Sequence, residues 1–181
     1  FPSPFFFRAD ITQQSEETQT IYFGKFPVIE KSIFSWTSPA ARLRFADLGT
    51  VSYELPQQGS WTGSLIRKDQ FMIAGGEIRF MTTEDAENGR VLVHQEQLSR
   101  RKTDFMLPEI VARMERAQDD VIRADWKGSF LISGPAGSGK TTLAFHRIAF
   151  LLQSPEAAEH FSDENIIVFV QDENTKAYFA R

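Results

Sequence analysis

The hydrophobic pattern of the chain changes near residue 100. Before that point, short apolar runs recur between glycine and proline residues. Such runs with frequent turn signals are typical of a small antiparallel sheet or barrel. We expect strands at about 21–23, 28–29, 32–36, 50–54, 64–66, 70–73, 77–80 and 90–93, and a hairpin around residues 74–76.

Beyond residue 103, apolar residues recur at helical spacing or in compact runs. Ile110, Met114 and Val121 fall on one face of a helix predicted over residues 108–125, and Pro108 suits its first turn. Compact runs at 129–133 and 166–170 predict buried strands, with helices over 143–153 and from about 174. This alternation predicts an α/β fold with a parallel sheet.

The change of pattern predicts two parts, a β-rich accessory module over residues 1–103 and an α/β part over residues 104–181. The basic run at 99–103 is predicted to be an exposed linker. The first part carries 12 basic and 12 acidic residues, and the second carries 8 and 12. Neither part has the excess positive charge of an autonomous nucleic-acid binder.

The composition, with 41% apolar residues, is sufficient for a packed core. The absence of cysteine rules out a disulfide framework and fits a reducing compartment, so we expect a cytoplasmic location. We expect no membrane association, because no apolar run approaches the roughly 20 residues that cross a bilayer. The chain does not begin with methionine, and we expect it to be a piece of a larger protein.

Residues 134–141 match the phosphate-binding motif G-x-x-x-x-G-K-[ST], between a predicted strand and a predicted helix. Its glycines permit close backbone approach, and N–H groups at a helix N-terminus attract phosphate. Lys140 is the predicted catalytic residue, neutralising the β- and γ-phosphates, and Thr141 is predicted to hold Mg²⁺. The predicted phosphate-loop residues are Gly134, Pro135, Ala136, Gly137, Ser138, Gly139, Lys140 and Thr141.

The loop and the helix after it, residues 134–152, resemble the first motif of superfamily 1 helicases of the UvrD/Rep type, including the continuation at 146–149. Residues 117–123 resemble the Q motif of that family. The resemblance implies a P-loop (RecA-like) parallel sheet, ATP as ligand, Gln118 as the adenine-recognising residue and Thr142 near the base. A glutamine amide matches the N6/N7 edge of adenine, because it offers a donor beside an acceptor.

Four segments of the first half, 4–10, 21–25, 34–40 and 51–53, resemble the region before the ATPase core in the HelD (helicase IV-like) branch. That branch often has Asp-Trp-Arg where this chain has Ser35, Trp36 and Thr37, so both flanking charges are missing here. HelD-like proteins act on bacterial RNA polymerase. The resemblance therefore implies single-stranded DNA or RNA polymerase core as the partner of the full-length protein.

Hydrolysis requires a carboxylate on Mg²⁺ and groups that stabilise the transition state. Asp172 and Glu173 follow an apolar run as in a Walker B element, but their place also matches motif Ia of the UvrD-like family, or a solvated turn. We expect hydrolysis in the full-length protein and not in this fragment. Two alternatives stay open: a phosphate-loop kinase or other nucleotide phosphotransferase that uses Asp172, and a non-catalytic protein-interaction module.

Overall fold

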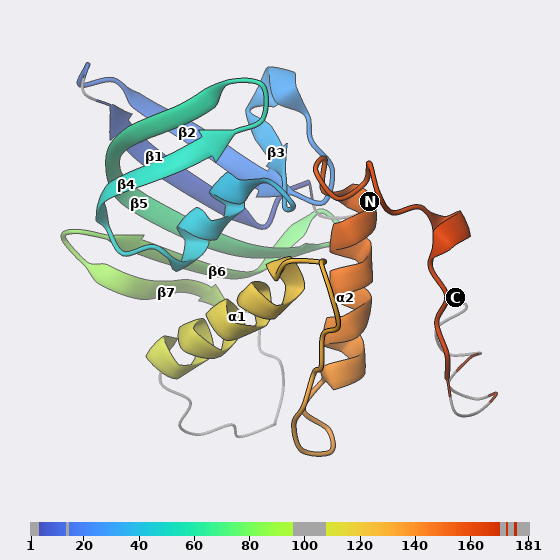
Figure 1. Cartoon of the computed structure of the whole chain (residues 1–181). Helices are drawn as coiled ribbons and strands as arrows, with labels where there is room; N and C mark the ends of the chain where they lie inside the picture. The colour runs from blue at the N-terminus through green and yellow to red at the C-terminus, as the bar shows by residue number, and fades with distance from the viewer. Residues whose placement is uncertain (1–3, 14, 96–107, 171–172, 174–175, 177–181) are drawn as a thin grey trace. The chain divides into compact units, whose positions relative to one another are not determined.

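The computed structural model describes residues 4–13, 15–95, 108–170, 173 and 176, and it divides into two units, residues 1–117 and 118–181 (Figure 1). The division falls inside helix α1 (Pro108–Arg123). The domain boundary near residue 103 stays a prediction. The basic run at 99–103 and Asp172 lie outside the described residues, as does most of the helix predicted from about 174.

The first unit is built on a seven-stranded, mostly antiparallel sheet. Its spatial order is β3-β2-β1-β5-β6-β7, with β4 also paired to β5, and only the β2–β3 pair is parallel among the pairs described. Two 3₁₀ helices, η1 and η2, accompany the sheet. The bounds are β1 Phe7–Gln13, β2 Thr18–Gly24, η1 Ile29–Lys31, β3 Ile33–Ser35, η2 Pro39–Phe45, β4 Gly49–Leu55, β5 Gly59–Ala74, β6 Glu77–Asp85 and β7 Gly89–Gln95.

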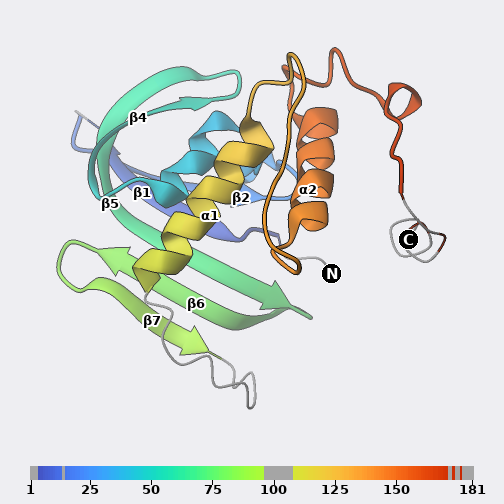
Figure 2. The same ribbon diagram turned by 60° about the horizontal axis from the view of Figure 1, so that its bottom comes forward.

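The long strand β5 holds this sheet together and curves across it (Figure 2). On one side it pairs with β1 over residues 63–70, and on the other it pairs first with β4 and then with β6. The two separate strands predicted at 64–66 and 70–73 are therefore one strand. The polar residues Arg67, Lys68 and Asp69 between them mark no turn, because they are paired within the ladder.

The hairpin predicted around residues 74–76 is confirmed. Gly75 and Gly76 form the two-residue connection between β5 and β6, with φ of +64° and +83°. Two positive φ values define the turn whose twist suits a two-residue hairpin, and glycine adopts them without strain. The strand predicted at 28–29 is wrong, since η1 begins at Ile29 and Val28 forms only an isolated bridge to Ile33.

The core of the first unit lies on one face of the curved sheet, under η2. Alternate residues of the strands point into it, as period-two side-chain alternation requires. Helix η2 closes the core with Ala40, Ala41 and Leu43. The core residues from the strands are Phe7, Ala9, Ile11, Ile21, Phe23, Phe34, Val51, Tyr53, Leu55 and Leu65.

The opposite face carries a network of charges across β1 and β5. Arg8 pairs with Asp10 at 2.7 Å and with the fully buried Asp69 at 3.3 Å, and Arg67 pairs with Asp69 at 3.0 Å. Thr20 donates a hydrogen bond to Asp10 at 2.8 Å. Because each buried carboxylate has charged partners, the network offsets the desolvation that burial imposes.

The second unit contains the end of α1, helix α2 (Lys140–Gln153) and the 3₁₀ helix η3 (Asp163–Asn165). Both long helices were predicted, and α2 begins three residues earlier than expected. Trp126 packs against Phe161, with ring centroids 6.4 Å apart. Two helices and their connections make up most of this unit.

The parallel strands predicted at 129–133 and 166–170 are not seen. Both runs lack strand pairing within the described chain, and Leu131 and Phe169 are 88% and 91% exposed. An apolar run can be a buried strand only where neighbouring strands supply ladder partners, and the described residues supply none for these two. The mixed α/β class is confirmed: the antiparallel sheet lies in the first unit, where it was predicted, and the described residues of the second unit show no parallel sheet.

The helices of the described chain include none that is long and apolar enough to cross a bilayer.

Replacing Phe23 with alanine is expected to destabilise the chain by about 3–5 kcal/mol, because it leaves a cavity in a closed core. Phe23 is fully buried and stacks on Phe7 at 5.6 Å. Urea unfolding followed by circular dichroism measures the change. The matched control is Phe26→Ala, since Phe26 is 61% exposed and its loss should cost less than about 0.5 kcal/mol. Equal losses from both variants would contradict the position of this core.

Candidate functional site

The phosphate-loop motif forms a turn that leads directly into α2. The last glycine of the motif, Gly139, is the N-cap residue, and its carbonyl accepts the first bond of the helix from Leu143 N–H at 2.9 Å. No side chain caps this end, and the first turn contains no acidic residue. The first N–H groups of a helix have no partner within it, so this end can accept an anion.

Glycine is required at two positions of this turn. Gly137 and Gly139 have φ of +78° and +80°, which L-residues with side chains adopt only at a cost. A Cβ at Gly134 would lie 2.9 Å from Ser138 Oγ, so the first glycine keeps the turn narrow. These are the backbone demands that a loop wrapped around phosphate makes.

The Lys140 side chain folds back across the loop. Its Nζ donates a hydrogen bond to the Pro135 carbonyl at 2.7 Å, and the same carbonyl accepts from Ser138 N–H at 3.3 Å. The ammonium group therefore lies over the loop, together with the N–H groups at the start of α2. A positive charge beside the uncapped N-terminus of a helix favours an anion such as phosphate.

The structure brings together the predicted loop residues Gly134 to Thr141. Thr141 and Thr142 are exposed on the first turn of α2, so the Thr141 hydroxyl is accessible to a cation carried by the phosphates. Gln118 lies on a different element, exposed on α1, and no described contact joins it to the loop. The loop residues form one turn that leads into α2, and the binding roles predicted for them and for Gln118 stay predictions.

A residue that the sequence reasoning left without a role, Arg147, is buried between the two helices. It is 9% exposed, and it donates hydrogen bonds to four carbonyls at the end of α1. Burial lowers the pKa of its guanidinium, and Asp125 opposes this effect. The signal in the sequence was a single arginine within the apolar run of α2, which a buried partner must satisfy.

A second contact joins the same helices through a buried ion pair. Asp119 and Arg123, four residues apart on α1, lie 3.0 Å apart and are both largely buried. The Arg123 guanidinium stands 5.2 Å from the centre of the Phe150 ring on α2. The end of α1 is therefore attached to the helix that leaves the phosphate loop at two places.

The carboxylates proposed for hydrolysis are not assembled in the described residues. Glu173 is exposed and pairs with Lys176 at 3.4 Å, and Asp172 is outside the described chain. Within residues 4–13, 15–95 and 108–170, no three His, Asp or Glu side chains gather as metal ligands. The Walker B and motif Ia interpretations of this segment both stay predictions.

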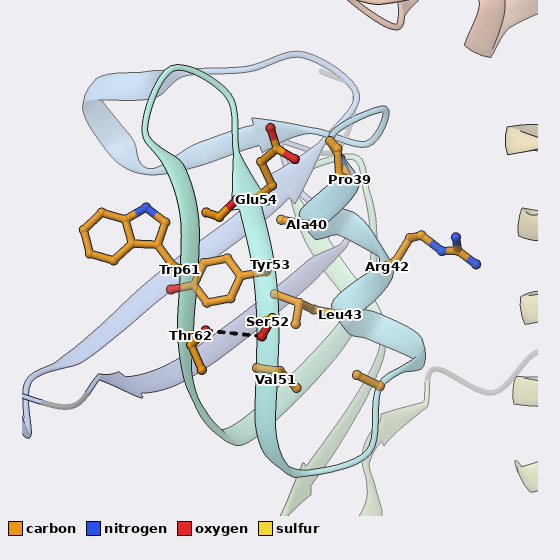
Figure 3. Close-up of a pocket in the computed structure, with 12 residues that line it drawn as sticks. Pro39, Ala40, Arg42, Leu43, Val51, Ser52, Tyr53, Glu54, Trp61 and Thr62 are labelled. Carbon is orange, nitrogen blue, oxygen red and sulfur yellow. Dashed lines mark hydrogen bonds between the residues drawn. The ribbon is translucent and has the colours of Figure 1, made fainter.

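The β-rich unit has a hollow of about 630 Å³ between η2 and the β4–β5 hairpin (Figure 3). Leu43 and Tyr53 line it, with Arg42 and the half-exposed Trp61 at its margin. Burial raises the pKa of the Tyr53 phenol above its ordinary value, and the Gln13 side chain opposes this effect. The hollow has no catalytic pair, and we assign it no chemistry.

Comparisons with protein-family models and with curated proteins find no match to this chain.

Replacing Gly139 with alanine is expected to weaken the binding of tripolyphosphate, an anion without a nucleoside, by about 5- to 30-fold. The variant strains the backbone by roughly 1–2 kcal/mol in the loop conformation. Isothermal titration calorimetry measures the affinity. The matched control is Gly128→Ala, which has φ of +93° but lies outside the loop. A Cβ meets nothing within 4 Å at either position, so both carry the backbone cost alone. Equal affinities for the two variants would contradict the loop as the anion site.

Proposed function

We propose that this chain is the ATP-binding portion of a helicase-like motor ATPase of superfamily 1. Its loop binds the phosphates of Mg-ATP, and the full-length protein hydrolyses the nucleotide. The observation that carries the proposal is the glycine turn of residues 134–139 at the open end of α2, with Lys140 folded over it. A glycine turn with positive φ, a lysine and an uncapped helix end are the parts of a nucleoside-triphosphate cradle.

Each of the proposed site residues binds a different part of the nucleotide. The N–H groups at the start of α2 and the Lys140 ammonium bind phosphate oxygens, and Thr141 supplies a hydroxyl to Mg²⁺. Bound Mg²⁺ neutralises phosphate charge during transfer. Gln118 selects adenine through its amide, and Thr142 lies near the base. These residues bind and orient the nucleotide, and Lys140 also stabilises charge on the transferred phosphate.

The finer proposal places the full-length protein in the HelD-like branch, acting on complexes of RNA polymerase with nucleic acid. The front-half resemblance and the balanced charge of residues 1–103 support it, because a module without excess positive charge is poorly suited to track nucleic acid alone. In this proposal the β-rich module contacts protein. The RecA-like parallel sheet belongs to the same proposal.

The Lys140→Ala variant is expected to reduce the affinity for Mg-ATP by about 10- to 100-fold, the usual worth of a charged hydrogen bond. It should also abolish ATP turnover by the full-length protein. Binding is measured with a fluorescent ATP analogue, and turnover by phosphate release. Lys127→Ala is the matched control, since Lys127 is exposed in the same unit and outside the loop. Unchanged affinity and turnover in Lys140→Ala would refute the proposed function.

The Gln118→Ala variant is expected to reduce the preference for ATP over GTP about tenfold, because a paired amide is worth 1–3 kcal/mol of base discrimination. Tripolyphosphate binding should not change. Competition between the two nucleotides measures the preference. Gln153→Ala, which changes an exposed glutamine at the far end of α2, provides the control. A preference that survives in Gln118→Ala assigns base recognition elsewhere.

The alternatives give different results in the full-length protein. ATP turnover stimulated by RNA polymerase core supports the HelD-like proposal, and stimulation by single-stranded DNA alone supports a conventional helicase. Loss of phosphate transfer in a folded Asp172→Ala variant, with a small acceptor present, would indicate a nucleotide phosphotransferase. Polymerase binding that persists without any nucleotide affinity would indicate an interaction module.

A further inference from the structure

The buried Arg147 side chain joins three segments around the phosphate loop. Its Nη1 donates to the carbonyls of Val121, Ile122 and Ala124 at 3.0, 3.1 and 2.8 Å, and its Nη2 donates to the Asp125 carbonyl at 2.9 Å. The last carbonyls of a helix have no partner within it. Arg147 therefore caps α1 from α2, more than 20 residues away in sequence.

The guanidinium also contacts the segment that enters the loop. Its Cζ stands 4.6 Å from the centre of the Phe130 ring, four residues before the loop begins at Gly134. Arg147 itself lies on the helix that leaves the loop. One side chain thus contacts the end of α1 and the entry segment from a position on the exit helix.

The sequence positions of Lys140, Arg147 and Gln118 give their approximate separations along the two helices. It lies seven residues after Lys140, about 10 Å along a helix that rises 1.5 Å per residue. Gln118 lies three residues before Val121, about one turn back along α1. Lys140 therefore lies about two helical turns from Arg147 along α2, and Gln118 lies about one turn from a carbonyl that the Arg147 guanidinium binds.

We propose that Arg147 is a positioning residue that holds Gln118 at the correct distance from the phosphate loop and so sets the choice of nucleobase. It contacts neither base nor phosphate. This inference rests on the proposed function, because it requires a nucleotide whose base and phosphates are held by different helices. Four bonds to backbone carbonyls at residues 121–125 hold the end of α1 in one position relative to α2.

Arginine is suited to this role by its shape. A guanidinium has several N–H donors in a rigid plane, whereas a lysine ammonium presents three donors from a single atom on a flexible stem. Methionine fills a similar volume and donates nothing. The affinity for adenine nucleotides should therefore fall in the order arginine, lysine, methionine.

The experiment compares Mg-ATP, Mg-GTP and tripolyphosphate binding by the full-length protein. Arg147→Met should weaken ATP binding about tenfold, the loss expected for a displaced base contact. It should change GTP and tripolyphosphate binding less than about twofold, and Arg147→Lys should fall between. Lys127→Met, which removes an exposed positive charge from the same unit, is the control.

A double variant that combines Arg147→Met with Gln118→Ala distinguishes a positioning role through Gln118 from general support of the fold. If Arg147 acts through Gln118, the double variant loses no more ATP preference than Gln118→Ala alone, because residues in one pathway are not additive. Additive losses, or an equal loss for tripolyphosphate, overturn the inference. Should Arg147→Met fail to fold, Arg147→Lys replaces it in the same cycle.

The failure of this inference is distinguishable from failure of the proposed function. ATP binding that depends on Lys140, together with additive losses at Gln118 and Arg147, overturns only the positioning role. A wild-type protein that does not bind ATP or tripolyphosphate overturns both.

Discussion

A buried guanidinium makes the largest set of polar contacts between the helices of the second unit. The described residues of this unit form no sheet that could hold its helices, so the contacts between α1 and α2 must do so. Arg147 supplies four hydrogen bonds to backbone carbonyls, and the Asp119–Arg123 pair against Phe150 supplies a second attachment. A buried charge is expensive unless each donor is satisfied. Four backbone acceptors offset part of that cost, with the two Nη1–H groups shared among three carbonyls, and they fix the end of α1 against α2.

In the first unit, the elements are held in place by backbone pairing between strands. β5 is long enough to pair with β1 on one side and with β4 and β6 on the other, so backbone bonds define the register of four strands at once. That register directs alternate residues into the apolar core and places Arg8 opposite Asp69 on the other face. A slip by one residue would expose the core side chains and bury the charges, which makes the observed register strongly preferred.

Local patterns predicted the two long helices and the glycine hairpin, together with the phosphate loop, because propensity and turn chemistry decide those features over a few residues. Strand β1 was not predicted, since Arg8 and Asp10 interrupt its apolar residues, and part of what stabilises them, Asp69 and Thr20, lies on neighbouring strands. The continuity of β5 was missed for the same reason. The role of Arg147 depends on carbonyls more than 20 residues away, and no spacing rule connects an arginine with such acceptors.

The apolar runs on either side of α2 explain why the sequence predicted a parallel sheet there. Leu131 and Phe169 are almost fully exposed, and burying each would contribute roughly 1.5–3 kcal/mol. In the proposed motor, a parallel sheet would bury both runs and fix the entry to the phosphate loop from the side that Arg147 does not reach. The guanidinium would then orient the helix that carries Gln118, while the sheet would hold the turn before Lys140. In that proposed motor, base selection and phosphate binding would thus depend on different contacts.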